Sequence, residues 1–585
     1  TNKNSSTPKM DVFKKMKDDP ENPFGATIRQ KTYIGKDGKE HLSALNIVNE
    51  EGDWNTWKKT LSSQMLSKQS TALAKKQLKL AYDIKKEEFD EICSLKNPVI
   101  KKCLLDKFAD NCDSSAVHLK AAGLPRQASK VILPFPEMKD SEIYAPSYRN
   151  GEKVVLIRYP HGGTFEIPEL VVNNKSNKKA KGLIGNAQDA VGINPRVAER
   201  LSGADFDGDT VLVIPVGKVK IKTSAPLKGL KNFDPKVAYP GYPGMPKPGE
   251  KGSGFDKQGK MGDISNLITD MTIKGAPADD IAAAVRHSMV VIDAEKHNLN
   301  WRQSYLDNGI ANLKAKYQGA SNAGASTLIS RAKGDKRVPK RKDGYKVDPE
   351  TGRKIFTETG ETYEKNGKQV VRLQKSSKMY ETEDAYSLSS GTAMENTYAD
   401  HANKLKALAN SARKTSLTTK PIPYSPEAKA KYRQEVDSLN AKLNIALKNR
   451  PLERKAQLLA NERVKLVRQN NPDMDKDDIK KLKNQALTQA RLQTGASKKA
   501  RLVDITDREW EAIQSGAIST NKLSQIIQNS DLDILKQRSM PRESRGISDA
   551  KRARAKMLES NGYTLAEIAD SLGVSTSTIS KVLNE

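Results

Sequence analysis

Short apolar runs separated by turn-forming residues dominate the chain from about residue 121 to residue 218. The runs EKVVLIRYP and GGTFEIPELVV have the length and the β-branched content of strands, and Val211–Ile214 forms a third, continuous apolar run. Gly, Pro and Asn residues stand between these runs, where the chain must turn. Many short strands joined by tight turns are typical of a small barrel, so we expect a β-barrel in this segment.

Helical periodicity flanks the expected barrel on both sides. Upstream, Trp57, Leu61 and Met65 recur at intervals of four and share one helical face. Downstream, Asp263 is in place to cap a helix, and Ser425-Pro426-Glu427 combines an N-cap with a first-turn proline ahead of a long helix. Pro451 and Asn471-Pro472 interrupt that later pattern, which favours a packed helical scaffold over a coiled coil.

The pattern therefore predicts an α+β fold with helical layers around the barrel. Its expected parts are a mostly helical N-terminal segment (1–120), a β-barrel core (121–218), a Pro/Gly-rich linker or flap (219–260), a helical segment (261–335), a β-meander insertion (336–375), a helical scaffold (376–540) and a C-terminal helical unit (541–585). Because the chain does not begin with methionine, we expect it to be cut or processed and truncated upstream.

An acidic turn directly precedes the third apolar run, in the stretch GADFDGDTVLVI. Its carboxylates, Asp205, Asp207 and Asp209, are close enough to repel one another, and a divalent cation is the usual way to relieve such repulsion. All-oxygen ligands suit Mg²⁺ or Ca²⁺. A calcium loop of the EF-hand type needs Gly and Glu where Thr210 and Val216 stand, so that loop is excluded. A solvated acidic turn and a Mg²⁺ site for nucleotidyl transfer remain as alternatives.

GADFDGD resembles the Asn-Ala-Asp-Phe-Asp-Gly-Asp signature of the largest subunit of cellular RNA polymerases, of which RNA-silencing and single-chain phage RNA polymerases carry shorter forms. Ala204 through Asp209 match residue for residue, whereas Gly203 stands in place of the asparagine. The resemblance implies that residues 121–218 form a double-psi β-barrel catalytic core whose three aspartates hold the catalytic Mg²⁺. The family also has a second, lysine-bearing barrel upstream, which residues 1–120 do not display; we expect it to be diverged or to lie on a missing portion.

A second element, IRYPHG, is similar to the Asn-Arg-x-Pro element that lies upstream of the aspartates in the cellular enzymes. This resemblance implies that Arg158 contacts the nucleotide sugar or the RNA 3′ end and that Pro160 shapes the loop. A guanidinium offers several donors to sugar or phosphate oxygens, which agrees with that role. The alternative is an ordinary surface arginine. His161 beside two glycines is more typical of a structural residue, and we assign it no role.

The C-terminal sequence YTLAEIADSLGVSTSTISKVLN has the layout of a helix-turn-helix and resembles such units in bacterial regulators and recombinases. Gly573 stands at the turn, and Ser577, Thr578 and Lys581 lie on the second helix. In a helix-turn-helix, residues of that helix contact DNA, so we expect these three residues to bind nucleic acid. The alternative is a small helical unit for protein contacts.

Charge and composition narrow the function classes. The 585 residues contain 100 Lys and Arg against 71 Asp and Glu, a formal net charge of +29, which favours polyanionic partners. Aromatic residues make up only 5% of the chain, so base stacking is not the expected mode of binding. The three cysteines, Cys93, Cys103 and Cys112, match no zinc or disulfide spacing and favour the cytoplasm, that of a bacterial host if the protein is phage-encoded. No apolar run has the length of a membrane span.

The sequence thus favours a template-directed RNA polymerase, a nucleotidyltransferase that uses Mg²⁺ and nucleoside triphosphates. The resemblance to single-chain phage RNA polymerases implies a phage-encoded enzyme, and the C-terminal unit favours a DNA template, with an RNA product as the further partner. An RNA-dependent RNA polymerase of the same superfamily is one alternative. A non-catalytic DNA-binding phage protein, in which the acidic turn is only structural, is the other.

Overall fold

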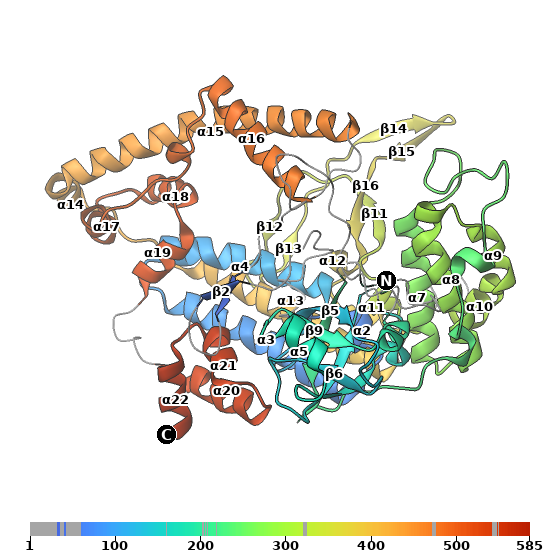
Figure 1. The fold of residues 1–585 in the computed structure, drawn as a ribbon. Coiled ribbons are helices and arrows are strands. Elements are labelled where there is room, and N and C mark those ends of the chain that lie inside the picture. The colour runs from blue at the N-terminus through green and yellow to red at the C-terminus, as the bar shows by residue number, and fades with distance from the viewer. Residues whose placement is uncertain are drawn as a thin grey trace.

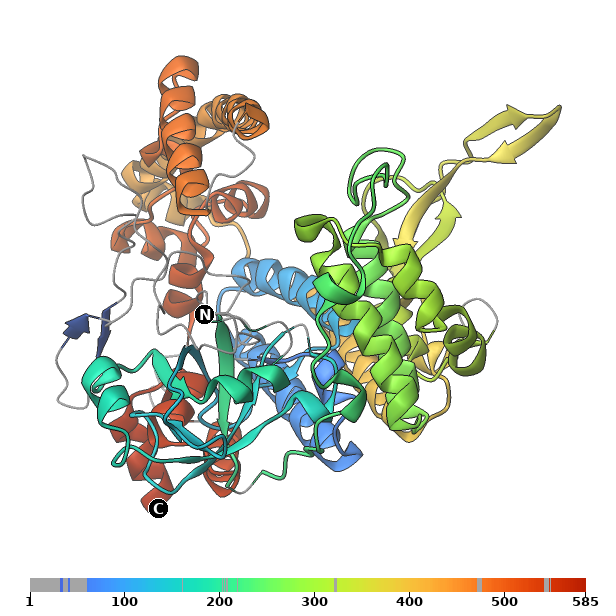
Figure 2. The same cartoon turned by 45° about the vertical axis from the view of Figure 1, so that its right-hand side comes forward.

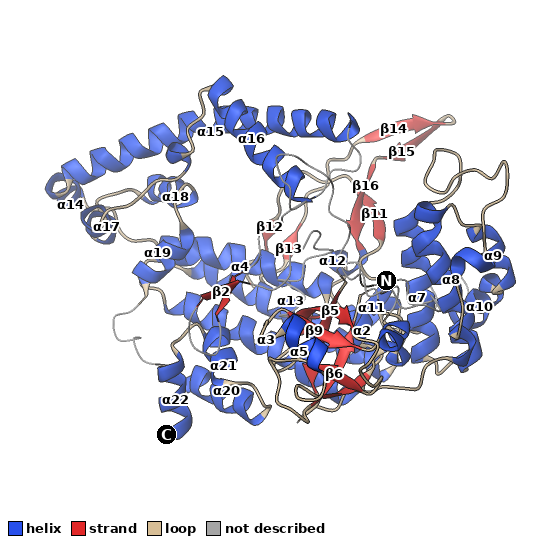
Figure 3. Ribbon diagram, viewed as in Figure 1, coloured by secondary structure: helices blue, strands red, loops and turns tan. Residues whose placement is uncertain are grey.

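The computed structural model describes residues 60–159, 161–201, 204, 206, 209–217, 219–319, 324–470, 476–540, 547 and 549–585, together with two paired strands near the N-terminus, β1 (Thr32–Ile34) and β2 (Glu40–Leu42). Helices form most of this part, and the strands concentrate in one barrel and a few two-stranded pairs (Figure 3). Among the described residues, no helix combines the length and the apolarity needed to cross a membrane.

A closed barrel of six strands lies within the segment where the apolar runs predict one. Around the barrel the strands follow the order β10-β5-β9-β6-β8-β7. The β5–β9 and β6–β8 pairs are parallel and the other four pairs are antiparallel. Their bounds are β5 (Ala128–Pro134), β6 (Glu142–Tyr144), β7 (Lys153–Ile157), β8 (Glu169–Val172), β9 (Ala190–Ile193) and β10 (Thr210–Pro215). An α+β fold with a barrel is therefore confirmed, while the double-psi topology stays a prediction.

Strand β10 explains why the third apolar run is continuous rather than alternating. Val211 and Val213 belong to the apolar cluster that fills the barrel, whereas Leu212 and Ile214 belong to the cluster shared with the surrounding helices. Successive side chains of a strand point to opposite faces, so a strand buried on both faces needs apolar residues at every position. In the part of the chain that the structure covers, this is the one closed barrel.

Three long helices form the layer against the outer face of the barrel: α3 (Thr71–Ser94), α4 (Pro98–His118) and α13 (Ala393–Thr418), which pack against one another (Figure 1). Each begins at a side-chain cap. The amide of Leu73 donates to Ser70 Oγ, and the amides of Val99 and Ile100 donate to Asn97 Oδ1. Short pieces complete the junction with the barrel: α2 (Ser63–Leu66), the pair β3 (Thr60–Leu61) with β4 (Ala121–Ala122), α5 (Lys178–Ile184) and α11 (Thr327–Arg331).

A second group of helices stands beside the barrel, at the right of Figure 1. It consists of α6 (Pro235–Ala238), α7 (Lys257–Ile273), α8 (Ala278–His297), α9 (Trp301–Asp307) and α10 (Ile310–Gln318). The expectation that Asp263 caps the first long helix is wrong. The cap is Asp256, whose Oδ2 accepts the Gly259 amide at 3.1 Å, and the helix starts about two turns earlier.

The segment after α11 forms three antiparallel pairs and a short helix, α12 (Lys378–Glu381). The pairs join β11 (Asp335–Pro339) to β16 (Leu373–Ser377), β12 (Lys346–Val347) to β13 (Lys354–Ile355), and β14 (Thr362–Lys365) to β15 (Lys368–Val371). The outermost hairpin, β14–β15, projects away from the body (Figure 2). Asn366 and Gly367 both have positive φ at its tip, the geometry that a two-residue hairpin turn requires.

Helical elements make up the remainder: α14 (Pro426–Lys431), α15 (Arg433–Asn470), α16 (Lys476–Thr494), α17 (Asp507–Gln514), α18 (Thr520–Gln528) and α19 (Leu532–Ser539). Ser425 caps α14 as expected, but Pro451 does not end the helix in which it stands. Pro451 is exposed, so water can solvate the carbonyl that loses its backbone partner. Helix α16 packs against α15 through small apolar residues and through Arg491, which forms two hydrogen bonds with Glu453.

The C-terminal unit consists of α20 (Asp549–Ser560), α21 (Leu565–Leu572) and α22 (Thr576–Asn584). Gly573 ends α21 in the left-handed conformation at φ 65°, at the expected turn. The unit contacts the start of the barrel segment, because Tyr563 Oη donates to the Gly123 carbonyl at 2.7 Å and the Arg126 amide donates to Glu567.

Candidate functional site

The loop that follows β7 and the turn that precedes β10 meet at one end of the barrel. These strands pair antiparallel, with Ile157 opposite Leu212, so the end of one strand lies beside the start of the other. Arg158 comes directly after β7, and Asp209 comes directly before β10. The Arg158 guanidinium donates to Asp209 Oδ1 at 2.6 Å, and the two side chains are only 12% and 4% exposed. Two residues that were predicted from separate motifs therefore form a buried ion pair.

Asp209 is held in place by the backbone of the turn and of the barrel. Its Oδ2 accepts the Phe206 amide at 3.0 Å, and its carbonyl accepts the Ile132 amide of β5 at 3.0 Å. Phe206 has φ 63°, a left-handed conformation that is costly for an aromatic residue and is offset by burying its ring among the barrel core residues. Asp209 is thus fixed by the Phe206 amide through its side chain and by β5 through its backbone.

Asp205 and Asp207, the other two predicted metal ligands, lie outside the described residues, as does Pro160. Asp209 supplies a buried anionic oxygen of the kind that Mg²⁺ prefers, and here the Arg158 guanidinium compensates its charge. In the described ranges alone, no group of three or more His, Cys, Asp or Glu side chains is placed to hold a metal ion. The three-aspartate metal site therefore stays a prediction. Of its residues the structure describes Asp209, together with the neighbouring Arg158.

Buried polar groups pin the loop that carries Arg158. Lys68 Nζ donates to the His161 carbonyl at 3.2 Å, and the Gly162 amide donates to Glu166 Oε2 at 2.6 Å. Further along, the Arg200 guanidinium donates to the carbonyls of Phe165 and Ile167, each at 3.3 Å. The bonds from Lys68 and Arg200 come from other stretches of the chain, and the bond from Gly162 to Glu166 closes the loop on itself. Together they restrict the movement of the loop that carries Arg158.

Burial shifts the pKa of two side chains at this loop, Lys68 and His161. Burial lowers the pKa of Lys68 to about 8, while the nearby Glu166 carboxylate acts in the opposite direction and raises that pKa. Burial, and secondarily the charge of Lys68, lower the pKa of His161 well below its usual value, so the imidazole is neutral at physiological pH. Both ring nitrogens of His161 are buried and lack a hydrogen-bond partner in the described structure.

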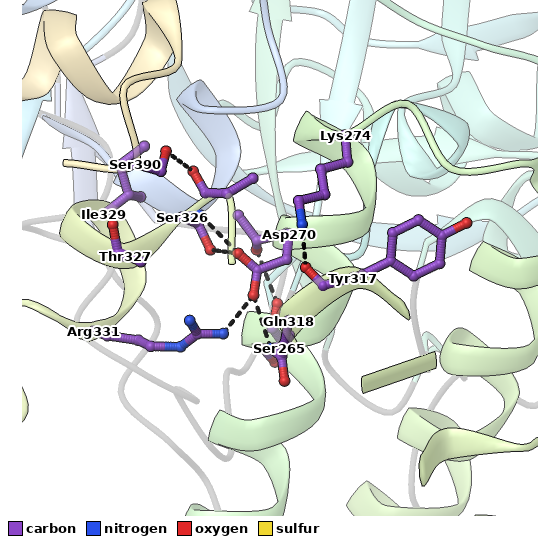
Figure 4. Close-up of polar contacts among 12 residues, drawn as sticks. Ser265, Asp270, Lys274, Tyr317, Gln318, Ser326, Thr327, Ile329, Arg331 and Ser390 are labelled. Atoms are coloured by element: carbon purple, nitrogen blue, oxygen red, sulfur yellow. Dashed lines mark hydrogen bonds and ion pairs between the residues drawn. The ribbon is translucent and has the colours of Figure 1, made fainter. Parts of the chain in front are cut away.

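A second buried carboxylate, Asp270 on α7, ties the helical group to the core (Figure 4). Asp270 Oδ1 accepts the Ser326 amide at 2.6 Å, and Oδ2 accepts Gln318 Nε2 at 2.8 Å and forms an ion pair with Arg331 at 2.5 Å. Gly324 approaches so closely that a Cβ there would lie 2.7 Å from Oδ2, at a φ of 139°. The cluster fixes α11 against α7.

The predicted nucleic-acid contacts of the C-terminal unit lie together on α22. Ser577 and Lys581 are exposed and Thr578 is half-buried, while Ile579 and Val582 face the small apolar core of the unit. Ser575 caps the helix by accepting the Thr578 amide at 3.2 Å. The polar face of α22 is thus open to a partner, and its binding to DNA stays a prediction.

Sequence reasoning missed Lys68, Glu166 and Asp270. Nothing in the local pattern marks Lys68 and Asp270, because each acquires its environment from a segment far away in the chain: Lys68 lies 93 residues from the carbonyl it contacts. Only the match of IRYPHG draws attention to the neighbourhood of His161.

The ion pair between Arg158 and Asp209 is open to a direct test. Removing one partner of a buried pair typically costs about 3–5 kcal/mol, because the remaining charge loses its compensation. We expect Arg158→Ala to lower the free energy of unfolding by about that amount in urea titrations. Arg149→Ala, at an exposed arginine in the same segment, should change it by less than about 0.5 kcal/mol. Equal stabilities of the two variants would contradict the pairing.

The buried Lys68 predicts a pH dependence of stability. The native state releases its proton near pH 8 and the unfolded chain near 10.5, so the wild type gains stability as the pH rises between these values. Lys68→Met lacks this gain. Between about pH 7.5 and about pH 9.5 the difference in unfolding free energy between the two proteins should change by roughly 2 kcal/mol. Lys181→Met, at an exposed lysine, should follow the wild type, and parallel pH profiles for all three proteins would show that Lys68 is not desolvated.

Similarity to known proteins is found among solved structures. The chain is similar to the solved structure of the RNA dependent RNA polymerase QDE-1 from Thielavia terrestris, with a TM-score of 0.36 and 12% sequence identity. The match covers 90% of this chain and 60% of that enzyme, so the chain spans less than two thirds of its length. No protein-family profile matches the chain, and no curated protein matches it.

Proposed function

We propose that this protein is a template-directed RNA polymerase, a nucleotidyltransferase that joins nucleoside triphosphates. The observation that carries the proposal is the meeting of Arg158 and Asp209 at one barrel end, because each residue belongs to a different motif of the same enzyme family. A buried carboxylate held by backbone hydrogen bonds, beside a guanidinium, is an arrangement suited to nucleotide chemistry.

In this proposal Asp205, Asp207 and Asp209 hold Mg²⁺, which when bound supplies Lewis-acid stabilisation of the negative charge at the reacting phosphate. The chain's own residues position the reactants. Asp209 is oriented by the Phe206 amide, and Arg158 is oriented by Asp209, so the guanidinium lies beside the acidic turn, where the proposal has it contact sugar or phosphate oxygens. The excess of lysine and arginine holds template and product through phosphate groups, without reading base sequence.

The proposal allows two kinds of template, DNA and RNA. The C-terminal helices favour DNA, as expected from the sequence, whereas the solved enzyme to which the chain is similar is RNA-dependent, which agrees better with an RNA template. The two alternatives differ in one measurable property, the nucleic acid on which synthesis occurs.

Substitution of a predicted metal ligand tests the enzyme assignment. Asp207→Ala should reduce Mg²⁺-dependent RNA synthesis by at least about 100-fold, since loss of a metal ligand removes roughly 3 kcal/mol of transition-state stabilisation. Asp140→Ala, at an exposed aspartate, should leave synthesis unchanged. Incorporation of labelled nucleotides is measured on single-stranded RNA and DNA templates in parallel, which also identifies the template. Equal synthesis by the two variants would remove the catalytic assignment.

The polar face of α22 favours a second candidate function, DNA binding by a helix-turn-helix. Each lost phosphate contact should reduce the salt dependence of binding by about one unit of slope. We expect Lys581→Ala to weaken duplex DNA binding in this way, while Lys556→Ala, at an exposed lysine on α20, has no effect. Identical salt titrations of both variants and the wild type, measured by fluorescence anisotropy, would exclude α22 as a DNA contact.

A further inference from the structure

A groove of about 580 Å³ runs between α7 and the core of the protein, beside the loop that carries Arg158. Its walls come from α2, α7, the end of α8 and the region of α11. The Asp270 cluster of Figure 4 holds α11 and α7 in the relative position that forms this groove. Its lining surface is mostly apolar, and uncharged polar side chains also contribute to it: Ser63, Gln64, Gln258, Asn266, Thr269 and Ser330.

A smaller cavity of about 30 Å³ adjoins the groove and shares Gln64, Met261, Ser265 and Ile292 with it. Lys68 and His161 lie at this inner end, where Lys68 is only 4% exposed and His161 only 1% exposed. Glu166 also lines this cavity. A cavity of this size admits one water-sized group, such as a single oxygen of a larger ligand. The groove and the cavity together make a site that narrows from solvent to two buried nitrogen-bearing side chains.

The imidazole of His161 is the observation that favours a bound ligand in this cavity. It lines the cavity, yet neither ring nitrogen has a hydrogen-bond partner in the described residues. A buried polar group without a partner costs about 1–3 kcal/mol, so its position is explained if a bound group supplies the missing hydrogen bond. A neutral imidazole donates from one nitrogen, and the neighbouring ammonium of Lys68 also donates.

The charges of the lining favour an anion. The titratable groups of the groove and its inner cavity are Lys68, Lys257, Lys333, His161 and Glu166. With His161 neutral these amount to three positive charges and one negative charge. The Glu166 carboxylate accepts the Gly162 amide, and hydroxyl and amide donors line the space between the lysines. A ligand with several oxygens and more than one negative charge matches this arrangement.

We propose that the groove binds a free polyphosphate group, with one phosphate oxygen at Lys68 and His161 and the remaining phosphates extending toward Lys257 and Lys333. The identification of its natural source as the triphosphate of a nucleotide or the pyrophosphate product rests on the proposed polymerase function. The binding itself does not rest on that function, since it follows from the side chains of the groove.

An anion at Lys68 has a thermodynamic consequence that can be measured without catalysis. It stabilises the charged form of the lysine, whose pKa of about 8 leaves it largely neutral at about pH 9. Binding at that pH must therefore take up a proton, and most of the uptake is lost when Lys68 is replaced, with a smaller share left to Lys333, whose pKa burial also lowers.

The experiment is isothermal titration of the full-length chain with inorganic tripolyphosphate, without Mg²⁺ or template, at about pH 9 in buffers of different ionisation enthalpy. The wild type is expected to bind with proton uptake. Lys68→Met should raise Kd about tenfold, the loss of one charge-assisted hydrogen bond, and remove most of the uptake. Lys333→Ala, at an exposed position where folding is not at risk, should weaken binding severalfold with most of the uptake retained. Lys181→Met is the matched control and should bind as the wild type does.

A parallel titration with a short single-stranded oligonucleotide separates the two sources of phosphate. If only the oligonucleotide binds in a Lys68- and Lys333-dependent way, the polyphosphate assignment is overturned. It is overturned equally if tripolyphosphate does not bind, or binds all four proteins alike. Absence of RNA synthesis with tripolyphosphate binding intact would refute the polymerase function and leave the groove assignment standing, so the two failures are distinguishable.

Discussion

The antiparallel pairing of β7 with β10 is the constraint on which the candidate site depends. It closes the barrel, and it places the residue after one strand next to the residue before the other. Without closure, Arg158 and Asp209 would have no reason to meet across 51 residues of sequence. The same closure brings the Ile132 amide of β5 to the Asp209 carbonyl, so the turn is held from both neighbouring strands. A rigid sheet thus positions a short acidic loop, which is the usual way in which a scaffold positions reactive side chains.

Buried charges then connect the barrel to its surroundings. Lys68, Asp270 and Glu395 are each buried in the interior, yet each contacts backbone groups of a distant segment. Glu395 of α13 accepts the amides of Leu328 and Ile329 at the first turn of α11, and Asp270 accepts the amide just before it. A short helix cannot satisfy its first amides by itself, so two carboxylates from different helices hold it in place. The wall of the groove is therefore defined by polar contacts as much as by apolar packing.

What the sequence predicts well is what depends on neighbouring residues. The apolar run of β10, the cap at Ser425 and the left-handed Gly573 each follow from a few adjacent positions. The start of α7 was misplaced because Asp256 and Asp263 are both suitable caps, and only packing decides between them. The expected interruption at Pro451 was wrong because water replaces the missing backbone partner on an exposed face. Lys68 carries no local signal, since its low pKa arises from burial by residues that lie far away in the chain.

The loop from Arg158 to Glu166 belongs to the candidate site at one end and to the groove at the other. Lys68 donates to the carbonyl of His161, and both residues line the inner cavity that adjoins the groove. A group bound at Lys68 would therefore contact the same ammonium that supports the loop beginning at Arg158. Coupling between two sites is reciprocal, so, if the groove binds a polyphosphate as proposed, the affinity of the groove and the contact of Arg158 with Asp209 would influence each other through this loop.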